Sequence, residues 1–201
     1  FLPVPRVRKI DQGYALEESA PLSVGKMRAF NGNSLILLRA YTYIRCLGKE
    51  GVKKVSEAAI LNANYLRAKL RDKYHVPMDE ACMHECIFTP AKQKPHGIKT
   101  LDIAKRLLDF GFHPPTIYFP LIVDEAMMIE PTETESKQTL DLFIQAMRTI
   151  ADEAEKTPDI LKTAPHTTPV RRLDEVKAAR EPNLRWTAPA SSGSAQSVRS
   201  W

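Results

Sequence analysis

The sequence predicts an α/β fold, more narrowly a small two-layer α+β domain in which about three short strands form a sheet covered by helices. Three observations lead to this class. Apolar residues recur at helical spacing in four segments between residues 34 and 156. Short apolar runs bounded by proline or glycine lie between the second and the fourth of these helical segments. The 201-residue chain is 43% hydrophobic and 26% charged, as in ordinary globular proteins.

The first two helices are expected between residues 33 and 74. Prolines and glycines punctuate residues 1 to 30, which we expect to be irregular. Asn33 or Ser34 suits the cap of a first helix, and Gly48 suits the position after its end. A second helix should run to about residue 74, before Pro77. The expected apolar positions are Leu37, Tyr41 and Ile44 in the first helix, and Val52, Val55, Ala59, Leu66 and Leu70 in the second.

A strand and a third helix are expected next. The run "CMHECIFT", residues 82 to 89, lies between two prolines and is typical of a strand. "KQKPH", residues 92 to 96, then reads as a solvated loop. "TLDIAKRLLDFG", residues 100 to 111, predicts a helix with Thr100 as its cap and Gly111 after its end. Its inner face should be formed by Leu101, Ala104 and Leu108.

Two more strands and a long helix complete the expected core. The runs "TIYFPLI", residues 116 to 122, and "AMMIE", residues 126 to 130, are short and apolar. Thr132 and Glu135 have capping-box spacing at the start of the last helix. Glu133 and Glu135 would then complement the dipole of its first turn. The expected buried stripe is Leu140, Phe143, Met147, Ile150 and Ala154. After residue 157 we expect one short helix, near residues 173 to 180.

Composition narrows the function classes. The net charge of +5 allows nucleic-acid binding, but no basic run is interleaved with aromatic residues, so a solvated basic surface is the preferred interpretation. Three cysteines do not make a disulfide framework and favour a reducing cytoplasm. No apolar run approaches the ~18 residues that span a membrane. Glycine-rich phosphate loops and the motifs G-x-S-x-G and H-E-x-x-H are absent from the sequence.

Cys82, His84 and Cys86 form the one candidate metal cluster. Alternate side chains of a strand share a face, and the outer two would stand roughly 7 Å apart. Zinc ligands would need a tight turn instead, and no second cysteine pair completes a set of four. The alternative, which we prefer, is that both cysteines pack as small apolar groups and His84 lies near a cleft.

A possible anion site precedes the first helix. The turn Asn31, Gly32, Asn33 and Ser34 stands where free amides and the helix dipole favour an anion. An ordinary helix cap explains the turn equally well. Arg39 and Arg45 lie on the following helix and could reach a carboxylate or phosphate, although helical arginines usually extend to solvent.

Several stretches resemble one family. They are "FLPVPRV", "GNSLILLRAYTYIRCLG", "ILNANYLRAKL", "CMHE", "GFHPPTIYFP", "MIEPTETES" and "APHTTPVRRLDEVKAAR". Together they resemble the C-terminal part of glycine dehydrogenase (decarboxylating), the P-protein of the glycine cleavage system. The similarity is greatest to subunit 2 of the split form found in bacteria and archaea, and it runs from residue 1 to about Trp186.

The resemblance implies a pyridoxal-phosphate enzyme of the aspartate-aminotransferase fold type. Such an enzyme decarboxylates glycine and passes the aminomethyl group to the lipoyl arm of the H-protein. The implied partners are the P-protein subunit 1, in a heterotetramer of two copies of each subunit, and the H-protein, in a bacterial or archaeal cytoplasm. No nucleic acid, membrane or metal is implied. The implied organisation is a connection from the large domain at 1–30, the small domain with its leading helices at 31–157, the family's tail at 158–186, and a disordered extension at 187–201.

The sequence departs from the family in ways that bear on catalysis. The family's Schiff-base lysine lies in a His-Lys stretch followed by a glycine-rich run, and this chain contains neither. We therefore expect that lysine upstream of Phe1 and expect this fragment to be inactive alone. Residues 187 to 201 have no counterpart in the family. Cys86 stands where a larger apolar residue is expected, which favours packing over metal binding.

The resemblance also suggests site candidates. Residues 82 to 88 would be an inner strand of the small domain, which places His84 and Glu85 at the cleft. The turn from Asn31 to Ser34 occupies the region where related enzymes contact the cofactor phosphate. A non-catalytic binding or assembly module remains the alternative, and a basic nucleic-acid binder is a weaker one.

Overall fold

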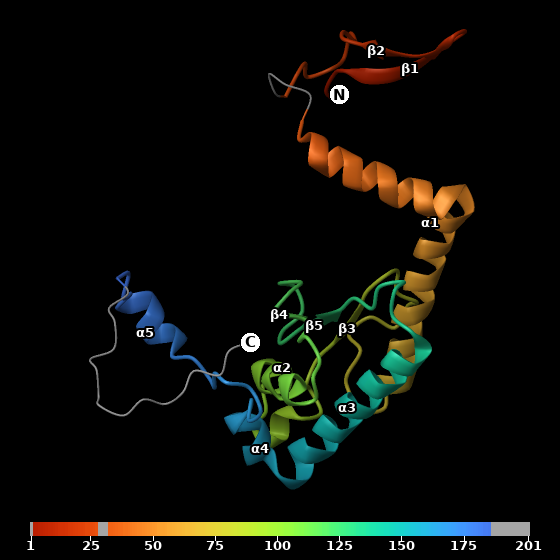
Figure 1. Ribbon diagram of the computed structural model, residues 1–201. Helices are drawn as coiled ribbons and strands as arrows, with labels where there is room; N and C mark the ends of the chain where they lie inside the picture. The colour runs from red at the N-terminus through yellow and green to blue at the C-terminus, as the bar shows by residue number, and fades with distance from the viewer. Residues whose placement is uncertain (1, 28–31, 186–201) are drawn as a thin grey trace, which may run out of the picture. The chain divides into compact units, whose positions relative to one another are not determined.

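The chain forms two compact units, residues 1–57 and residues 58–201. The structure is a computed structural model that describes residues 2–27 and 32–185 (Figure 1). Along these residues the helices and strands follow the predicted order of helix, helix, strand, helix, strand, strand and helix. Further elements lie at both ends, and a short 3₁₀ helix lies between the first core strand and the helix after it. The predicted mixture of short strands and covering helices is confirmed.

The first unit contains a hairpin that the sequence did not suggest. Strands β1 (Arg6–Ile10) and β2 (Gly13–Glu17) pair antiparallel, and an ion pair of 2.6 Å joins Arg6 to Glu17. The expectation of irregular structure throughout residues 1 to 30 is wrong. Its prolines lie outside the two strands, and Gly13, the first residue of β2, has φ 125° next to the turn. These residues therefore do not break the hairpin.

Helix α1 (Ser34–Leu70) is interrupted at the predicted glycine. Gly48 has φ 65° and ψ −179°, so the helical conformation breaks there, as its predicted place after the first helix requires. The predicted cap is also confirmed, because Asn33 Oδ1 accepts hydrogen bonds from the amides of Leu35 at 3.0 Å and Ile36 at 3.4 Å.

The second unit contains an antiparallel three-stranded sheet in the order β3–β5–β4. Its strands are β3 (Cys86–Phe88), β4 (Thr116–Ile117) and β5 (Met127–Ile129). Cys86 pairs with Ile129, and Thr116 pairs with Met128. The central strand is therefore β5. The expectation that residues 82 to 88 form an inner strand is wrong, because β3 lies at the edge of this sheet.

The predicted strand is also too long at its start. Residues 82 to 85 include a bend, and pairing begins only at Cys86. The Asn64 side chain on α1 explains the difference: it donates to Cys82 O at 2.7 Å and accepts from Cys82 N at 3.1 Å. These bonds hold both backbone groups of Cys82, so they are not available to a strand partner.

Helix α2 (Thr100–Asp109) begins with a different cap from the one predicted. Lys99 occupies the cap position, and its amide donates to Asp102 Oδ2 at 2.9 Å. Thr100 is the first helical residue, and its hydroxyl donates to Glu125 O. The helix stops as predicted at Gly111, which has φ 78°. Its fully buried apolar residues are Ile103, Ala104 and Leu107, whereas Leu101 and Leu108 are only half-buried.

Helix α3 (Lys137–Lys156) begins later than the capping-box pattern predicts. Ser136 Oγ accepts from Thr139 N at 3.1 Å and caps the helix. Glu133 and Glu135 precede this cap, so neither lies in the first helical turn, and the assignment of Thr132 and Glu135 as a capping box is wrong. Ser136 offers the same kind of acceptor nearer to the buried stripe. That stripe is confirmed: Leu140, Phe143, Met147, Ile150 and Ala154 are all buried.

Residues 92 to 96 are not a simple solvated loop. They contain the short 3₁₀ helix η1 (Lys94–His96). Gln93 is buried and donates through Nε2 to Lys73 O at 2.9 Å. Lys92 Nζ donates to the carbonyls of Arg71 and Asp72, at 3.2 and 2.7 Å. These donors satisfy carbonyls that follow the end of α1, and they give the segment a structural role.

The core of the second unit lies between the sheet and the helices. Helices α2, α3 and α4 (Pro158–Thr163) pack against one another, as Figure 1 shows. Leu161 on α4 is fully buried in the same core, which therefore continues past residue 157. The predicted short helix near residues 173 to 180 is confirmed as α5 (Glu175–Arg180). The four predicted domain ranges remain predictions.

No helix among residues 2–27 and 32–185 is long and apolar enough to cross a membrane.

Candidate functional site

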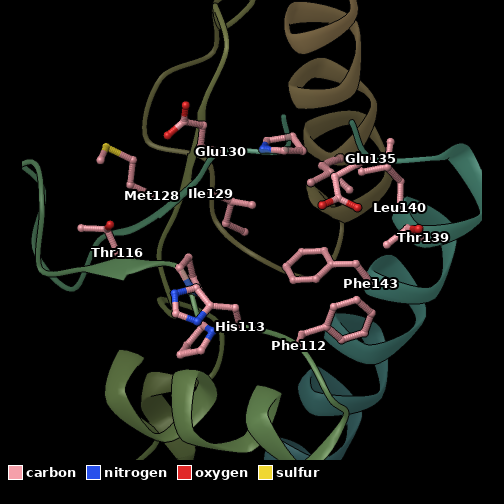
Figure 2. Close-up of a pocket in the computed structure, with 14 residues that line it drawn as sticks. Phe112, His113, Thr116, Met128, Ile129, Glu130, Glu135, Thr139, Leu140 and Phe143 are labelled. Carbon is pink, nitrogen blue, oxygen red and sulfur yellow. The ribbon is translucent and has the colours of Figure 1, made fainter. Parts of the chain in front are cut away.

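One pocket of about 390 Å³ gathers the most distinctive stretches of the second unit. The loop from Phe112 to Pro115, the paired strands β4 and β5, the residues after β5, and helices α1 and α3 all contribute to it (Figure 2). Its lining is Leu66, Phe112, His113, Pro114, Pro115, Thr116, Met128, Ile129, Glu130, Pro131, Glu135, Thr139, Leu140 and Phe143.

The inner part of the pocket is apolar and packed against the core. Phe112 and Phe143 meet edge to face, with ring centroids 5.2 Å apart and planes at 86°. Leu66, Ile129 and Leu140 belong to the buried core behind them. Because these side chains are held by the core, the pocket exists without any rearrangement of the chain.

The rim of the pocket is polar. His113, Glu130 and Glu135 are exposed and come from three different segments, and Figure 2 shows their side chains around the cavity. None of the three makes a side-chain hydrogen bond or ion pair with another described residue. They are free to contact a ligand, and the hydroxyls of Thr116 and Thr139 lie on the same lining.

The predicted cleft residues lie elsewhere. His84 is exposed and Glu85 is half-buried, both in the stretch before β3, and neither lines this pocket. Their role in a cleft remains a prediction. The geometry instead brings together His113, Glu130 and Glu135.

The cysteines near β3 behave as packing residues. Cys86 is fully buried and its thiol donates to Ile129 O at 3.7 Å, while Cys82 packs against the same core. Burial raises the pKa of the Cys86 thiol strongly and that of Cys82 to a lesser degree, which keeps both protonated. Within the described parts of the chain, no three His, Cys, Asp or Glu side chains are grouped so as to hold a metal ion.

At the predicted anion site, the Asn33 side chain already accepts the hydrogen bonds that an anion would accept. Asn31 lies outside the described residues. The amides of Leu35 and Ile36, which a phosphate would contact, already donate to the Asn33 side chain. An anion would have to displace that cap, so the described residues Gly32, Asn33 and Ser34 do not fit a phosphate as they stand. Arg39 and Arg45 are exposed on α1 in the same unit.

Sequence reasoning missed the pocket because its residues come from distant segments. A signal was nevertheless present. His113 and Glu130 each stand beside prolines, in "FHPP" and "IEPT", and Glu135 lies in the acidic stretch that follows. Binding and catalytic residues occur disproportionately on loops that a rigid scaffold positions, so polar residues next to prolines outside the helices and strands were a usable signal.

Comparisons with known proteins point to one family. Residues 55–168 match the family model described as glycine dehydrogenase, C-terminal domain, a range that includes the whole pocket. A probable glycine dehydrogenase (decarboxylating) subunit 2 from Caldanaerobacter subterraneus subsp. tengcongensis is 57% identical over 187 residues, covering 93% of this chain and 39% of that protein. A protein of the same description from Oceanobacillus iheyensis is 57% identical over 186 residues, covering 92% and 38%.

A solved structure shows the same fold. The crystal structure of glycine decarboxylase (P-protein) of the glycine cleavage system, in inhibitor-bound form, superposes with a TM-score of 0.54 at 16% identity, covering 72% of this chain and 34% of that one. The chain thus spans about two fifths of the length of the curated relatives named above. The resemblance drawn from the sequence motifs is confirmed, and the chain belongs to the glycine dehydrogenase C-terminal domain family.

Proposed function

We propose that this chain supplies the C-terminal domain of a glycine dehydrogenase (decarboxylating) of the subunit 2 type. The whole enzyme would release carbon dioxide from glycine and transfer the aminomethyl group to the lipoyl arm of the H-protein. It would act in the cytoplasm, with subunit 1 as its companion in a heterotetramer.

One observation carries the proposal. The chain is 57% identical to subunit 2 proteins over nearly its whole length, and the matched range contains a pre-formed pocket built from its most distinctive motifs. Identity at this level over nearly the whole chain supports a shared function as well as a shared fold.

Pyridoxal phosphate, when bound to such an enzyme, supplies the electron sink for loss of carbon dioxide. The chain has no His-Lys stretch to attach this cofactor, and the amides at the start of α1 are occupied by Asn33. We infer that residues outside this chain hold the cofactor and that the chain alone is catalytically inactive.

The contribution of this chain is a shaped wall of the site. The aromatic pair Phe112 and Phe143 would exclude water from one side of a bound group. The His113 ring could donate or accept a hydrogen bond at the rim, because it has no side-chain partner among the described residues. His84 and Glu85 would contact the substrate in a cleft outside this pocket.

A chimeric enzyme tests the proposal. Residues 1–185 would replace the corresponding part of the Caldanaerobacter subunit 2, and the chimera would be combined with that organism's subunit 1 and H-protein. The measurement is exchange of labelled bicarbonate into glycine. We expect exchange within about tenfold of the parent enzyme, a loss of no more than ~1.4 kcal/mol in barrier terms.

The alternative function, a non-catalytic binding or assembly module, gives a different result. A chimera that folds and assembles with subunit 1 but shows no exchange above background would overturn the proposal and support the alternative. A chimera that also carries Glu80→Gln, a change at an exposed residue outside the pocket, serves as the control for activity lost during preparation. It should show the same exchange as the first chimera.

A further inference from the structure

The pocket carries negative charge on a protein that is basic overall. The chain has a net charge of +5, yet Glu130 and Glu135 stand at the pocket rim and no lysine or arginine belongs to its described lining. The local field therefore favours a cation, against the sign of the whole molecule.

The two carboxylates are available, unlike their neighbours. Asp141, near the start of α3, accepts hydrogen bonds from Lys137 at 2.6 Å and from Tyr65. Glu125, on the other side of β5, accepts the amide of Thr100 at 2.7 Å. Glu130 and Glu135 have no such partner among the described residues. A ligand that enters the pocket does not have to displace an existing ion pair.

The apolar inner part restricts what the cation can be. Phe112, Phe143 and Leu140 present carbon surface below the acidic rim. A bare inorganic cation would gain nothing from this surface, whereas an aliphatic stem would bury it at about 25 cal/mol per Å². A volume of 390 Å³ lies within the range of small-molecule pockets and accommodates such a stem.

We propose that this pocket binds a primary ammonium group carried on an unbranched aliphatic stem. The negative charge of Glu130 and Glu135 attracts the ammonium to the rim, and the stem lies against Phe112 and Phe143. A free alkylamine and a lysine side chain share this chemistry. Glycine does not fit it, because glycine lacks the stem and its own carboxylate would be repelled by the rim. The proposed ligand is therefore not the substrate of the proposed function, and the proposal does not rest on that function.

Titration of the 201-residue chain with three small probes tests the chemistry. Pentylamine has both the charge and the stem, pentanol has only the stem, and methylamine has only the charge. Amide chemical shifts at pH 7.5 and low salt give both the affinity and the place of binding. We expect pentylamine to bind at residues 112–116 and 128–131, at least threefold more tightly than either partial probe, and more weakly as salt is raised. Equal binding of pentanol, or shift changes elsewhere only, would overturn the proposal.

Variants of the two carboxylates provide the second test. Glu130→Gln and Glu135→Gln should each weaken pentylamine binding about threefold and leave pentanol unchanged. The control Glu80→Gln alters charge equally but lies outside the pocket, and it should bind pentylamine like the parent. An equal loss in the control would show a general charge effect and refute the site.

Nα-acetyl-lysine methylamide, a lysine whose backbone groups are blocked and whose side-chain ammonium is free, distinguishes the two sources of the ligand. Binding comparable to pentylamine indicates that the pocket accepts a lysine side chain from a polypeptide. Binding of pentylamine alone assigns the pocket to small amines. If neither compound binds, the proposal fails, whatever the outcome of the chimera assay.

Discussion

Arg106 on α2 donates hydrogen bonds to both carboxylate oxygens of Glu153 on α3, from Nε to Oε2 at 2.9 Å and from Nη2 to Oε1 at 2.8 Å. Its Nη1 also donates to Asp109 Oδ2 at 3.0 Å. These side chains are largely buried, so one arginine joins two helices in a region of low dielectric.

Removal of this arginine should be costly. Arg106→Ala leaves Glu153 without its bidentate partner and removes one partner from Asp109. We expect a loss of about 3 kcal/mol in the free energy of unfolding, measured by urea denaturation followed by circular dichroism. Lys162→Ala breaks the exposed pair with Asp159 and should cost less than ~0.5 kcal/mol. Similar losses for the two variants would contradict a special role for Arg106.

Asp109 should make the second unit sensitive to acid. Burial alone would raise the pKa of Asp109, but hydrogen bonds from the amides of Thr167 and His166 and from Arg106 outweigh it and lower the pKa to about 2. The unfolded carboxyl has a pKa of about 3.9. The ionised form therefore stabilises the fold above pH ~4, and this stability is lost as the pH falls towards 2.

The variant Asp109→Asn isolates this effect. It should lower stability at pH 7 by about 2 kcal/mol, and the difference from the parent should shrink between pH 4 and pH 2. Urea midpoints measured across this pH range provide the check. A difference that stays constant down to pH 2 would show that the Asp109 carboxylate is not the titrating group.

The three cysteines should react at different rates. Cys46 is exposed on α1, whereas Cys86 is fully buried and its pKa is raised by burial. With a thiol reagent such as dithiobis-nitrobenzoate, we expect Cys46 to react first, Cys82 more slowly, and Cys86 only on unfolding. Peptide mapping after timed quenching assigns each site. Early labelling of Cys86 would mean that β3 is not packed as described.

The first part of α1 should drive self-association of the isolated chain. Its apolar side chains occupy all sides of the helix at 100° per residue and remain exposed, a pattern typical of a helix that is buried on every side. They are Leu35, Ile36, Leu37, Leu38, Tyr41, Tyr43 and Ile44. We expect concentration-dependent oligomers in light scattering coupled to size exclusion.

A double substitution tests that expectation. Leu35→Lys with Leu38→Lys places charges on this surface and should shift the chain towards monomer. Leu61→Lys changes an isolated exposed leucine on the same helix and should leave the oligomer distribution unaltered. A monomeric parent chain at all concentrations would show that the surface does not associate.

Prediction from sequence succeeded where a few neighbouring residues decide the structure. The Asn33 cap and the breaks at Gly48 and Gly111 follow from side-chain length and from the freedom of glycine to adopt positive φ. The buried stripe of α3, including Leu140 and Met147, follows from helical periodicity. Such signals are local, so they do not depend on which element packs opposite.

It failed where distant groups compete for the same backbone. Cys82 looked like part of a strand, but Asn64 on α1 takes its amide and carbonyl. Thr100 looked like a cap, but its hydroxyl donates to Glu125, and Asp102 serves the preceding amide. In each case the predicted partner and the observed partner can both satisfy the backbone group's hydrogen bond, and only the folded arrangement decides between them.

The sequence by itself determined the order of the core elements, the inner face of α3 and the family to which the chain belongs. The reason is that helical periodicity and family motifs can be read from the sequence without knowing which residues are in contact. Only the tertiary structure decided that β5 is central, and that His113, Glu130 and Glu135 share one pocket while His84 and Glu85 do not line it. The physical reason is that strand order and unpaired charge depend on partners far along the chain, which local propensity does not encode.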